Sequence, residues 1–215
     1  MNLSKQAQDI YAEISKKGAK LGDLRMIAKE IKKDQQLAEE LWGTGKLMPG
    51  LLAILIFDTK AITPEVADVL LSDIDKQPDN DERLQLADWL MANQLMKYKK
   101  LIVLIQSWKN DAMPLKRRIF WYYQGRLRWT GQTPPGNTED LLREIEEKLL
   151  TEAPEVQWAM NFTAAWIGIF DKGYRDQCIK MGEKLGLYVD EIVPRNCTPN
   201  YLPKFIEQEV TKRKL

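Results

Sequence analysis

Apolar residues recur along most of the chain at steps of three and four, which is the spacing of one face of an α-helix. Alternating apolar and polar runs, which are typical of strands, are scarce. The pattern therefore predicts an all-α protein. We expect helices over residues 4–18, 23–42, 49–58, 64–76, 80–97, 99–110, 114–129, 138–152, 154–170, 174–186 and 203–213.

Local signals mark where several of these helices begin and end. Proline suits the first helical turn, where its missing N–H is not needed, and it opens the ranges 64–76, 114–129 and 154–170. In the range 23–42, we expect Asp23 to be the N-cap and Gly43 to stop the helix.

The most apolar run, 51–57, is far shorter than the roughly 20 residues that a membrane-spanning helix needs, so it predicts a buried helix. Residues 1–20 are polar and amphipathic and contain no secretory apolar core. From these features we expect a cytoplasmic protein without membrane contact.

A repeat is visible in the second half of the chain. Pro114 and Pro154 are forty positions apart, and each opens an aromatic-rich helix after a more ordinary amphipathic one. The offset pairs Arg118 with Trp158, Tyr122 with Phe162 and Arg126 with Trp166. Forty residues holding two helices is the HEAT or armadillo period. We therefore expect one α-helical repeat domain over residues 1–215, an α-solenoid superhelix with a concave groove, the alternative being an irregular helical bundle.

The composition excludes several kinds of chemistry. The 215 residues include no histidine, which rules out Ser-His-Asp and Cys-His catalysis and imidazole metal sites. Cys178 and Cys197 form no CxxC pair, and we expect reduced thiols, with a disulfide as the alternative. No dinucleotide-binding or P-loop motif occurs, and nothing indicates a metal or an organic cofactor.

The positive charge is concentrated although the whole chain is nearly neutral, with 32 Lys and Arg against 31 Asp and Glu. Residues 97–128 hold nine basic residues and one acid, Asp111, so this segment carries a net charge of +8. The basic residues are Lys97, Lys99, Lys100, Lys109, Lys116, Arg117, Arg118, Arg126 and Arg128. Such asymmetry is typical of a protein with a polyanionic partner. The alternative is a solvated basic face with acids opposite it in space.

Aromatic residues are interleaved with these cations, and aromatic faces can contact nucleic-acid bases while cations neutralise phosphates. The run Phe120 to Tyr123 spans all sides of a helix, so we expect only two or three of its members in the core. Trp158, Phe162 and Trp166 form one stripe at four-residue spacing, which is either core or ligand surface. The forty-residue offset places this stripe beside Arg118 and Arg126 as a mixed cationic and aromatic wall.

Asp88 is the candidate catalytic carboxylate. It lies in an otherwise apolar stretch, residues 84–91, so it is either near the helix surface or desolvated and functional.

An ordered set of motifs now indicates a family. The motifs are Ala87-Asp88-Trp89-Leu90, Ser107-Trp108, Pro114-Leu115-Lys116-Arg117-Arg118, Trp129-Thr130-Gly131-Gln132, Val156-Gln157-Trp158-Ala159-Met160-Asn161 and Cys197-Thr198-Pro199-Asn200-Tyr201-Leu202-Pro203. Over roughly residues 20–213 the chain resembles the DNA alkylation repair family, the HEAT-like-repeat alkylpurine DNA glycosylases. The resemblance implies an all-helical superhelix with a positively charged DNA groove and the excision of N3- and N7-alkylated purines from duplex DNA, without a cofactor.

The resemblance also implies roles for individual residues. Asp88 matches the family aspartate and would stabilise the cationic sugar or orient water. Trp89 and Phe162 would form the aromatic wall beside the lesion, and Arg118 would clamp a phosphate. Further DNA contacts would come from Lys116, Arg117, Arg126, Arg128 and Trp158.

This chain departs from the family pattern at two positions. Leu84 stands four residues before the aspartate, and Phe162 stands further along, where the pattern has tryptophans. A non-catalytic protein that binds DNA structure and a helical-repeat scaffold for another protein therefore stay open as alternatives. We expect a monomer in each case.

Overall fold

The computed structural model describes residues 3–16 and 18–215. All regular secondary structure assigned in these ranges is α-helix or 3-10 helix, and none of it is β-strand. The chain divides into two compact units, Met1–Gln106 and Ser107–Leu215. Each unit is a stack of helices with its own core.

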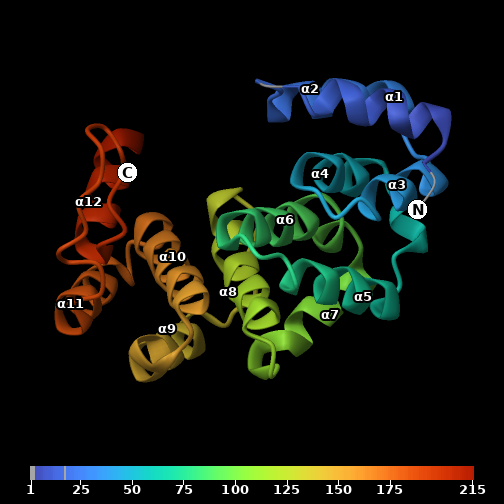
Figure 1. Cartoon of the computed structure of the whole chain (residues 1–215). Helices are drawn as coiled ribbons and strands as arrows, with labels where there is room; N and C mark the ends of the chain where they lie inside the picture. The colour runs from blue at the N-terminus through green and yellow to red at the C-terminus, as the bar shows by residue number, and fades with distance from the viewer. Residues whose placement is uncertain (1–2, 17) are drawn as a thin grey trace. The chain divides into compact units, whose positions relative to one another are not determined.

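Unit 1 is built around one apolar helix (Figure 1). Its elements are α1 (Lys5–Ile14), α2 (Leu21–Ile31), α3 (Gln35–Trp42), α4 (Leu47–Ile56), η1 (Thr59–Ala61), α5 (Pro64–Asp75), α6 (Asn80–Asn93), η2 (Leu95–Lys97) and α7 (Lys99–Ser107). Helix α4 packs against α2, α3 and α6. Leu51, Leu52, Ile54 and Ile56 of α4 are fully buried, which confirms the predicted buried helix.

The prediction of one helix over residues 23–42 is wrong, because the chain breaks between α2 and α3. Lys32 has a φ of 67°, which no α-helix accommodates. Asp34 then caps α3 by accepting the backbone N–H of Leu37 at 3.0 Å. The expected N-cap Asp23 instead lies inside α2, where its carboxylate accepts the backbone N–H of Lys20 at 2.8 Å.

Other predicted bounds shift for local reasons. The range 4–18 includes residue 17, which lies outside the described residues, and α1 ends at Ile14. The range 80–97 divides at Gln94, whose buried side chain donates to the carbonyl groups of Ile54 and Phe57. The ranges 99–110 and 138–152 likewise end in 3-10 turns. The spacing of apolar residues does not reveal side-chain hydrogen bonds that compete with the backbone hydrogen bonds of a helix.

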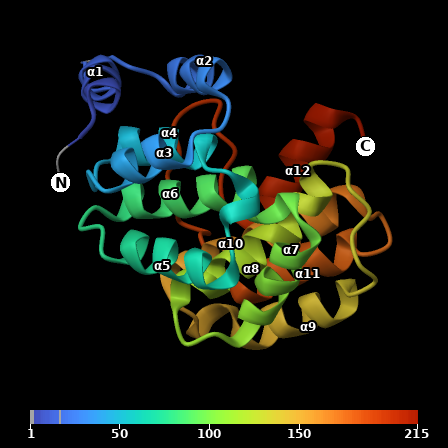
Figure 2. The same ribbon diagram turned by 90° about the vertical axis from the view of Figure 1, so that its right-hand side faces the viewer.

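In unit 2, one central helix packs against two others on either hand. Its elements are η3 (Trp108–Asn110), α8 (Pro114–Trp129), α9 (Thr138–Lys148), η4 (Leu149–Thr151), α10 (Pro154–Phe170), α11 (Arg175–Leu185) and α12 (Leu202–Arg213). Helix α10 packs against both α8 and α12, while α9 and α11 pack against α10 and against each other (Figure 2). Both α8 and α10 have the bounds that the sequence predicts.

The contact between α8 and α10 is close because it passes over a glycine. A Cβ added at Gly125 would lie 2.7 Å from Cδ1 of Phe162 and 3.2 Å from the backbone Cα of Thr163. The hydroxyl of Thr163 donates to the carbonyl of Trp121 at 2.6 Å, which ties the two helices together. This fixed contact decides how the side chains of the two helices meet.

Candidate functional site

Of the three pairs that the forty-residue offset predicts, two are in contact between α8 and α10, Arg118 with Trp158 and Tyr122 with Phe162. The guanidinium carbon of Arg118 lies 4.6 Å from the ring centroid of Trp158 and 5.9 Å from that of Tyr122. The ring of Tyr122 lies 5.1 Å from Phe162 and 5.7 Å from Trp158. We call this set the α8–α10 wall: Arg118, Tyr122, Trp158 and Phe162. The predicted cationic and aromatic wall is thereby confirmed at Arg118, while the predicted pair of Arg126 with Trp166 stays a prediction.

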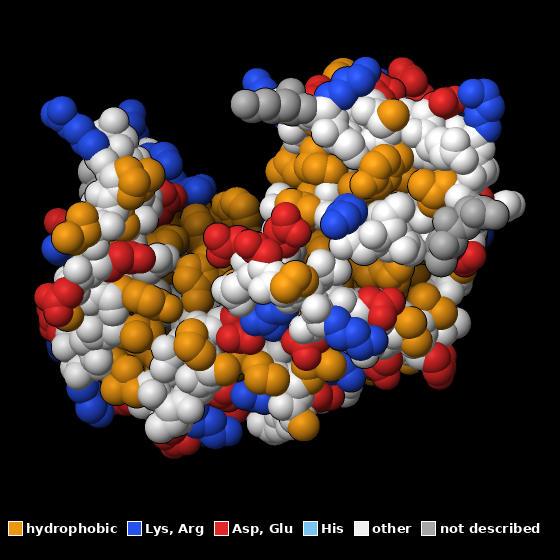
Figure 3. Space-filling view, in the orientation of Figure 1, with side chains coloured by type: hydrophobic (Ala, Val, Ile, Leu, Met, Phe, Trp, Pro, Cys, Tyr) orange, Lys and Arg blue, Asp and Glu red, His pale blue; other side chains and the backbone are white. Residues whose placement is uncertain are grey.

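The wall combines stacked rings with partial exposure. Trp158 and Phe162 stack at 5.1 Å with an interplanar angle of 19°, and both are half-buried, as is Tyr122. Hydrophobic side chains gather on the face of unit 2 over α10 (Figure 3). The neighbouring run behaves as expected, since Phe120, Trp121 and Tyr123 are buried.

The two arginines Arg118 and Arg128 are buried within unit 2. Arg118 is 4% exposed and donates to the carbonyl of Glu155 at 3.0 Å. Arg128 is 6% exposed and donates to the carbonyl of Gln124 and the hydroxyl of Thr138, each at 3.0 Å. Burial lowers the pKa of Arg128, and the nearby negative charge of Asp171 opposes that shift. Their positive charges are therefore fixed in place by the protein.

Several other cations of the basic segment face acids, as the alternative interpretation of that segment expects. Arg117 pairs with Glu152 at 2.8 Å, and Lys116 pairs with Asp111 at 3.6 Å. Lys109 pairs with Glu144. Arg117 also donates to the carbonyl groups of Asp111 and Ala112, so it holds the start of α8. Much of the segment's excess charge is thus balanced within unit 2.

Asp88 and Trp89 lie on α6 in unit 1, and both are half-buried. The indole N–H of Trp89 donates to the carbonyl of Leu51 at 3.0 Å, and Arg25 lies 4.8 Å above its ring. Arg25 is a neighbour that the sequence does not indicate, because it comes from α2. Asp88 lies in unit 1 and Arg118 in unit 2, and the roles that the resemblance implies for them stay predictions.

Two residues named in the motifs have structural roles. Asn161 is 2% exposed and donates to the carbonyl of Asn200 at 2.7 Å. The backbone N–H of Asn200 in turn donates to Glu191 at 2.7 Å. The segment that leads into α12 is therefore anchored to α10.

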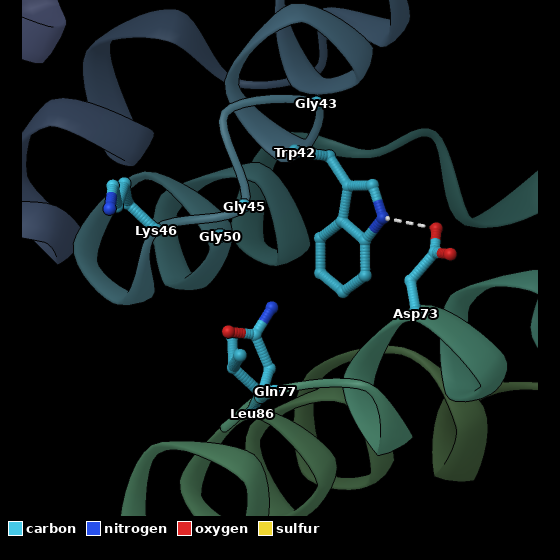
Figure 4. Close-up of a pocket in the computed structure, with 8 residues that line it drawn as sticks. All are labelled: Trp42, Gly43, Gly45, Lys46, Gly50, Asp73, Gln77 and Leu86. Carbon is cyan, nitrogen blue, oxygen red and sulfur yellow. Dashed lines mark hydrogen bonds between the residues drawn. The ribbon is translucent and has the colours of Figure 1, made fainter. Parts of the chain in front are cut away.

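Each unit also contains a pocket that the sequence analysis does not find. In unit 1, a pocket of about 300 Å³ is lined by Trp42, Gly43, Gly45, Lys46, Gly50, Asp73, Gln77 and Leu86. Figure 4 shows the Trp42 ring facing this space while its indole N–H donates to Asp73, at 3.3 Å. In unit 2, a pocket of about 410 Å³ lies beside Trp166 and Phe170.

The described residues contain no group of three or more His, Cys, Asp or Glu placed to hold a metal ion. Both cysteines are free thiols, with Cys178 buried and Cys197 exposed. Burial raises the pKa of Cys178 to about 12, so this thiol stays protonated. Within the same described ranges, no helix has the length and apolar character needed to cross a membrane.

Comparison with known proteins gives one family and one solved structure. The model of a family described as DNA alkylation repair enzyme matches residues 6–175. No curated protein matches the sequence. The solved structure is described as a new family of proteins related to the HEAT-like repeat DNA glycosylases with affinity for branched DNA structures. It is 19% identical, with a TM-score of 0.71 over 99% of this chain and 90% of that chain. This likeness shows a HEAT-like repeat fold.

Proposed function

Since this chain belongs to the DNA alkylation repair enzyme family, we propose that it binds double-stranded DNA and hydrolyses the N-glycosidic bond of N3- and N7-alkylated purines. The observation that carries the proposal is the α8–α10 wall, in which a buried arginine is stacked on aromatic rings. Aromatic faces attract cations by roughly 0.5–2 kcal/mol per contact, and an alkylated purine is itself a cation.

The reaction suits a protein without histidine. An N3- or N7-alkylated purine leaves as a neutral base, so no strong general acid is required. The electron pair of the bond departs with the base, and the sugar becomes oxocarbenium-like at C1′. Asp88 would stabilise this positive charge or accept a proton from the water that attacks C1′. Trp89 lies next to Asp88 on α6, and Phe162 would contribute an aromatic face to the lesion side.

The cations would act on the phosphates. We propose that Arg118, held over Trp158, attracts a phosphate through its fixed positive charge. Arg126, which is half-buried on α8, would add a nonspecific contact. Lys116, Arg117 and Arg128 are engaged within the protein, so we expect them to contribute mainly through their positive field. We propose that one chain, acting as a single repeat domain and a monomer, suffices for activity.

The test is release of alkylated base from a methylated duplex, comparing wild type with Asp88→Asn. We expect the rate to fall on the order of 100-fold, because the amide cannot stabilise positive charge at C1′. The matched control is Asp81→Asn, an exposed carboxylate on the same helix, which should keep the rate within about twofold. Equal rates for Asp88→Asn and wild type would remove Asp88 from the mechanism.

A second candidate function is DNA binding without catalysis. It is favoured by Leu84, which occupies a position where the family pattern has a tryptophan, and by the affinity of the similar solved protein for branched DNA. Under this alternative, the protein would bind duplex with an affinity that falls steeply with salt but release no base. The same assay, combined with a binding titration at two salt concentrations, separates the two candidates.

A further inference from the structure

Three aromatic rings continue beyond the α8–α10 wall and form a second surface within unit 2. Trp166 is buried, and its ring lies 5.9 Å from Trp129 and 5.6 Å from Phe170, with interplanar angles of 23° and 19°. Trp129 is 40% exposed and Phe170 is 42% exposed. We call these three residues the stacking platform. Its two outer rings are partly exposed, and unpaired bases stack on exposed aromatic rings.

Two arginines accompany the platform. The guanidinium carbon of Arg126 lies 5.2 Å from the Trp129 ring, and that of Arg213 lies 4.9 Å from Trp166 and 5.7 Å from Phe170. Glu209 accepts from Nε of Arg213 at 2.9 Å and holds it in place. Burial alone would raise the pKa of Glu209, but the hydrogen bond and the charges of Arg213 and Lys212 bring it below its ordinary value. The cation therefore keeps its anchor at neutral pH.

Two buried hydrogen-bond donors, one in the platform and one beside it, have no acceptor among the described residues. The indole N–H of Trp166 and the Nε–H of Arg126 are buried, and neither finds a partner among the described residues. Buried donors are nearly always paired in folded proteins, so two in one cluster indicate a ligand that brings acceptors. Nucleic acid carries acceptors on both its phosphates and its bases.

The pocket of about 410 Å³ adjoins this surface. Trp166, Ile167 and Phe170 supply its apolar side, while Arg128, Thr138 and Asp171 supply polar groups. The carboxylate of Asp171 disfavours a phosphate in this space. A pocket lined by both apolar and polar groups suits a nucleobase, which has an aromatic face and a hydrogen-bonding edge.

We propose that the stacking platform binds unpaired DNA bases, such as those of a single strand that continues from a duplex. One base stacks on Trp129 and another on Phe170, and a base reaches the adjoining pocket. Arg126 and Arg213 neutralise the phosphates between them. This surface goes beyond the proposed function, because it uses neither Asp88 nor the excision of a base. It rests on that function only for the choice of DNA as the polymer.

The test compares a blunt duplex with the same duplex carrying a single-stranded tail, using fluorescence anisotropy of labelled DNA at one salt concentration. Wild type should bind the tailed duplex at least tenfold more tightly, since each stacked base contributes about tenfold. The double variant Trp129→Ala with Phe170→Ala should lose that preference while its affinity for blunt duplex stays within about twofold.

Three further variants separate stacking from packing. Phe170→Tyr keeps an aromatic face and should keep the preference, whereas Phe170→Leu keeps apolar bulk and should lose several-fold of it. Leu150→Ala removes another exposed apolar side chain from unit 2, 53% exposed, and should change nothing. Thermal unfolding checks that each variant is folded.

An unchanged tail preference in the double variant would overturn the inference, as would an equal loss of affinity for blunt and tailed duplexes. Failure of base release from blunt duplex would count against the proposed function alone, because the tail preference is measured without catalysis.

Discussion

Trp166 of unit 2 differs from the two tryptophans of unit 1 in how its indole N–H group is satisfied. In unit 1, Trp42 donates to Asp73 and Trp89 donates to the carbonyl of Leu51. In unit 2, Trp166 is buried without an acceptor among the described residues. A protein that needs its aromatic residues only for packing satisfies their polar atoms internally. The contrast therefore favours unit 2 as the place where a ligand completes the structure.

The two units also differ in the kind of side chains that pack inside them. Unit 1 is centred on the aliphatic side chains of α4, which require only burial. Unit 2 packs several aromatic rings against arginines, including Arg118 over Trp158 and Arg213 over Trp166, whereas the described part of unit 1 has one such contact, Arg25 over Trp89. Rings and guanidinium groups hold one another in fixed orientations, so unit 2 presents charge at defined positions.

The largest expected effect comes from closing the space between α8 and α10. Gly125→Ala should lower the free energy of unfolding by about 2 kcal/mol, because the new Cβ meets a stacked ring and a backbone atom. The matched change in unit 1 is Gly50→Ala, whose Cβ meets the end of the Leu86 side chain at 3.1 Å. That side chain can move, and alanine is the better helix former, so we expect a change below about 0.5 kcal/mol. Chemical denaturation measures both.

Equal losses from the two alanine variants would contradict the view that the α8–α10 contact is the tighter of the two. Because Phe162 belongs to the α8–α10 wall, Gly125→Ala should also weaken DNA binding, whereas Gly50→Ala should not.

The second-largest expected effect is the loss of stability when a cation that holds the fold is removed. Arg117→Gln should cost about 1–2 kcal/mol of stability, since its pair with Glu152 is largely covered and three carbonyl or carboxylate groups lose a charged donor. Lys184→Gln removes an exposed pair with Glu146 and should cost less than about 0.5 kcal/mol. If Arg117→Gln lowers the stability as little as Lys184→Gln does, Arg117 does not hold the fold and is a cation available to contact DNA.

The smallest effect is a pH dependence at the platform. Glu209 has a pKa below its ordinary value of 4.5 in the folded state, so its contribution to stability is present above pH 4.5 and is lost as the pH falls through the folded pKa. Between pH 6 and pH 3, wild type should therefore lose more stability than Glu209→Gln, by less than about 1 kcal/mol. Parallel losses in urea titrations would show that Glu209 is not held by Arg213.

Much of the fold follows from periodicity. The bounds of α8 and α10 agree with the sequence because proline opens each helix and the apolar stripe runs to its end. The break between α2 and α3 does not follow, because it depends on a positive φ at Lys32 and on the capping bond of Asp34. Such local bonds compete with a helix that the pattern alone would continue.

The candidate site likewise contains contacts that the sequence predicts and contacts that it does not. The meeting of Arg118 with Trp158 is predictable, because a forty-residue repeat puts equivalent positions side by side. Phe170 could have been found, since it continues the stripe of Trp158, Phe162 and Trp166 by four residues. Arg213 and Arg25 carry no such signal, because each reaches its ring from a helix distant in sequence. The burial of Arg118 is likewise set by tertiary packing.

Base release from a methylated duplex tests the central claim most directly. We expect wild type to liberate N3- or N7-methylpurine and Asp88→Asn to do so on the order of 100-fold more slowly while binding the same duplex with unchanged affinity. Wild type that binds the duplex but liberates no base, or an Asp88→Asn variant as active as wild type, would contradict the account.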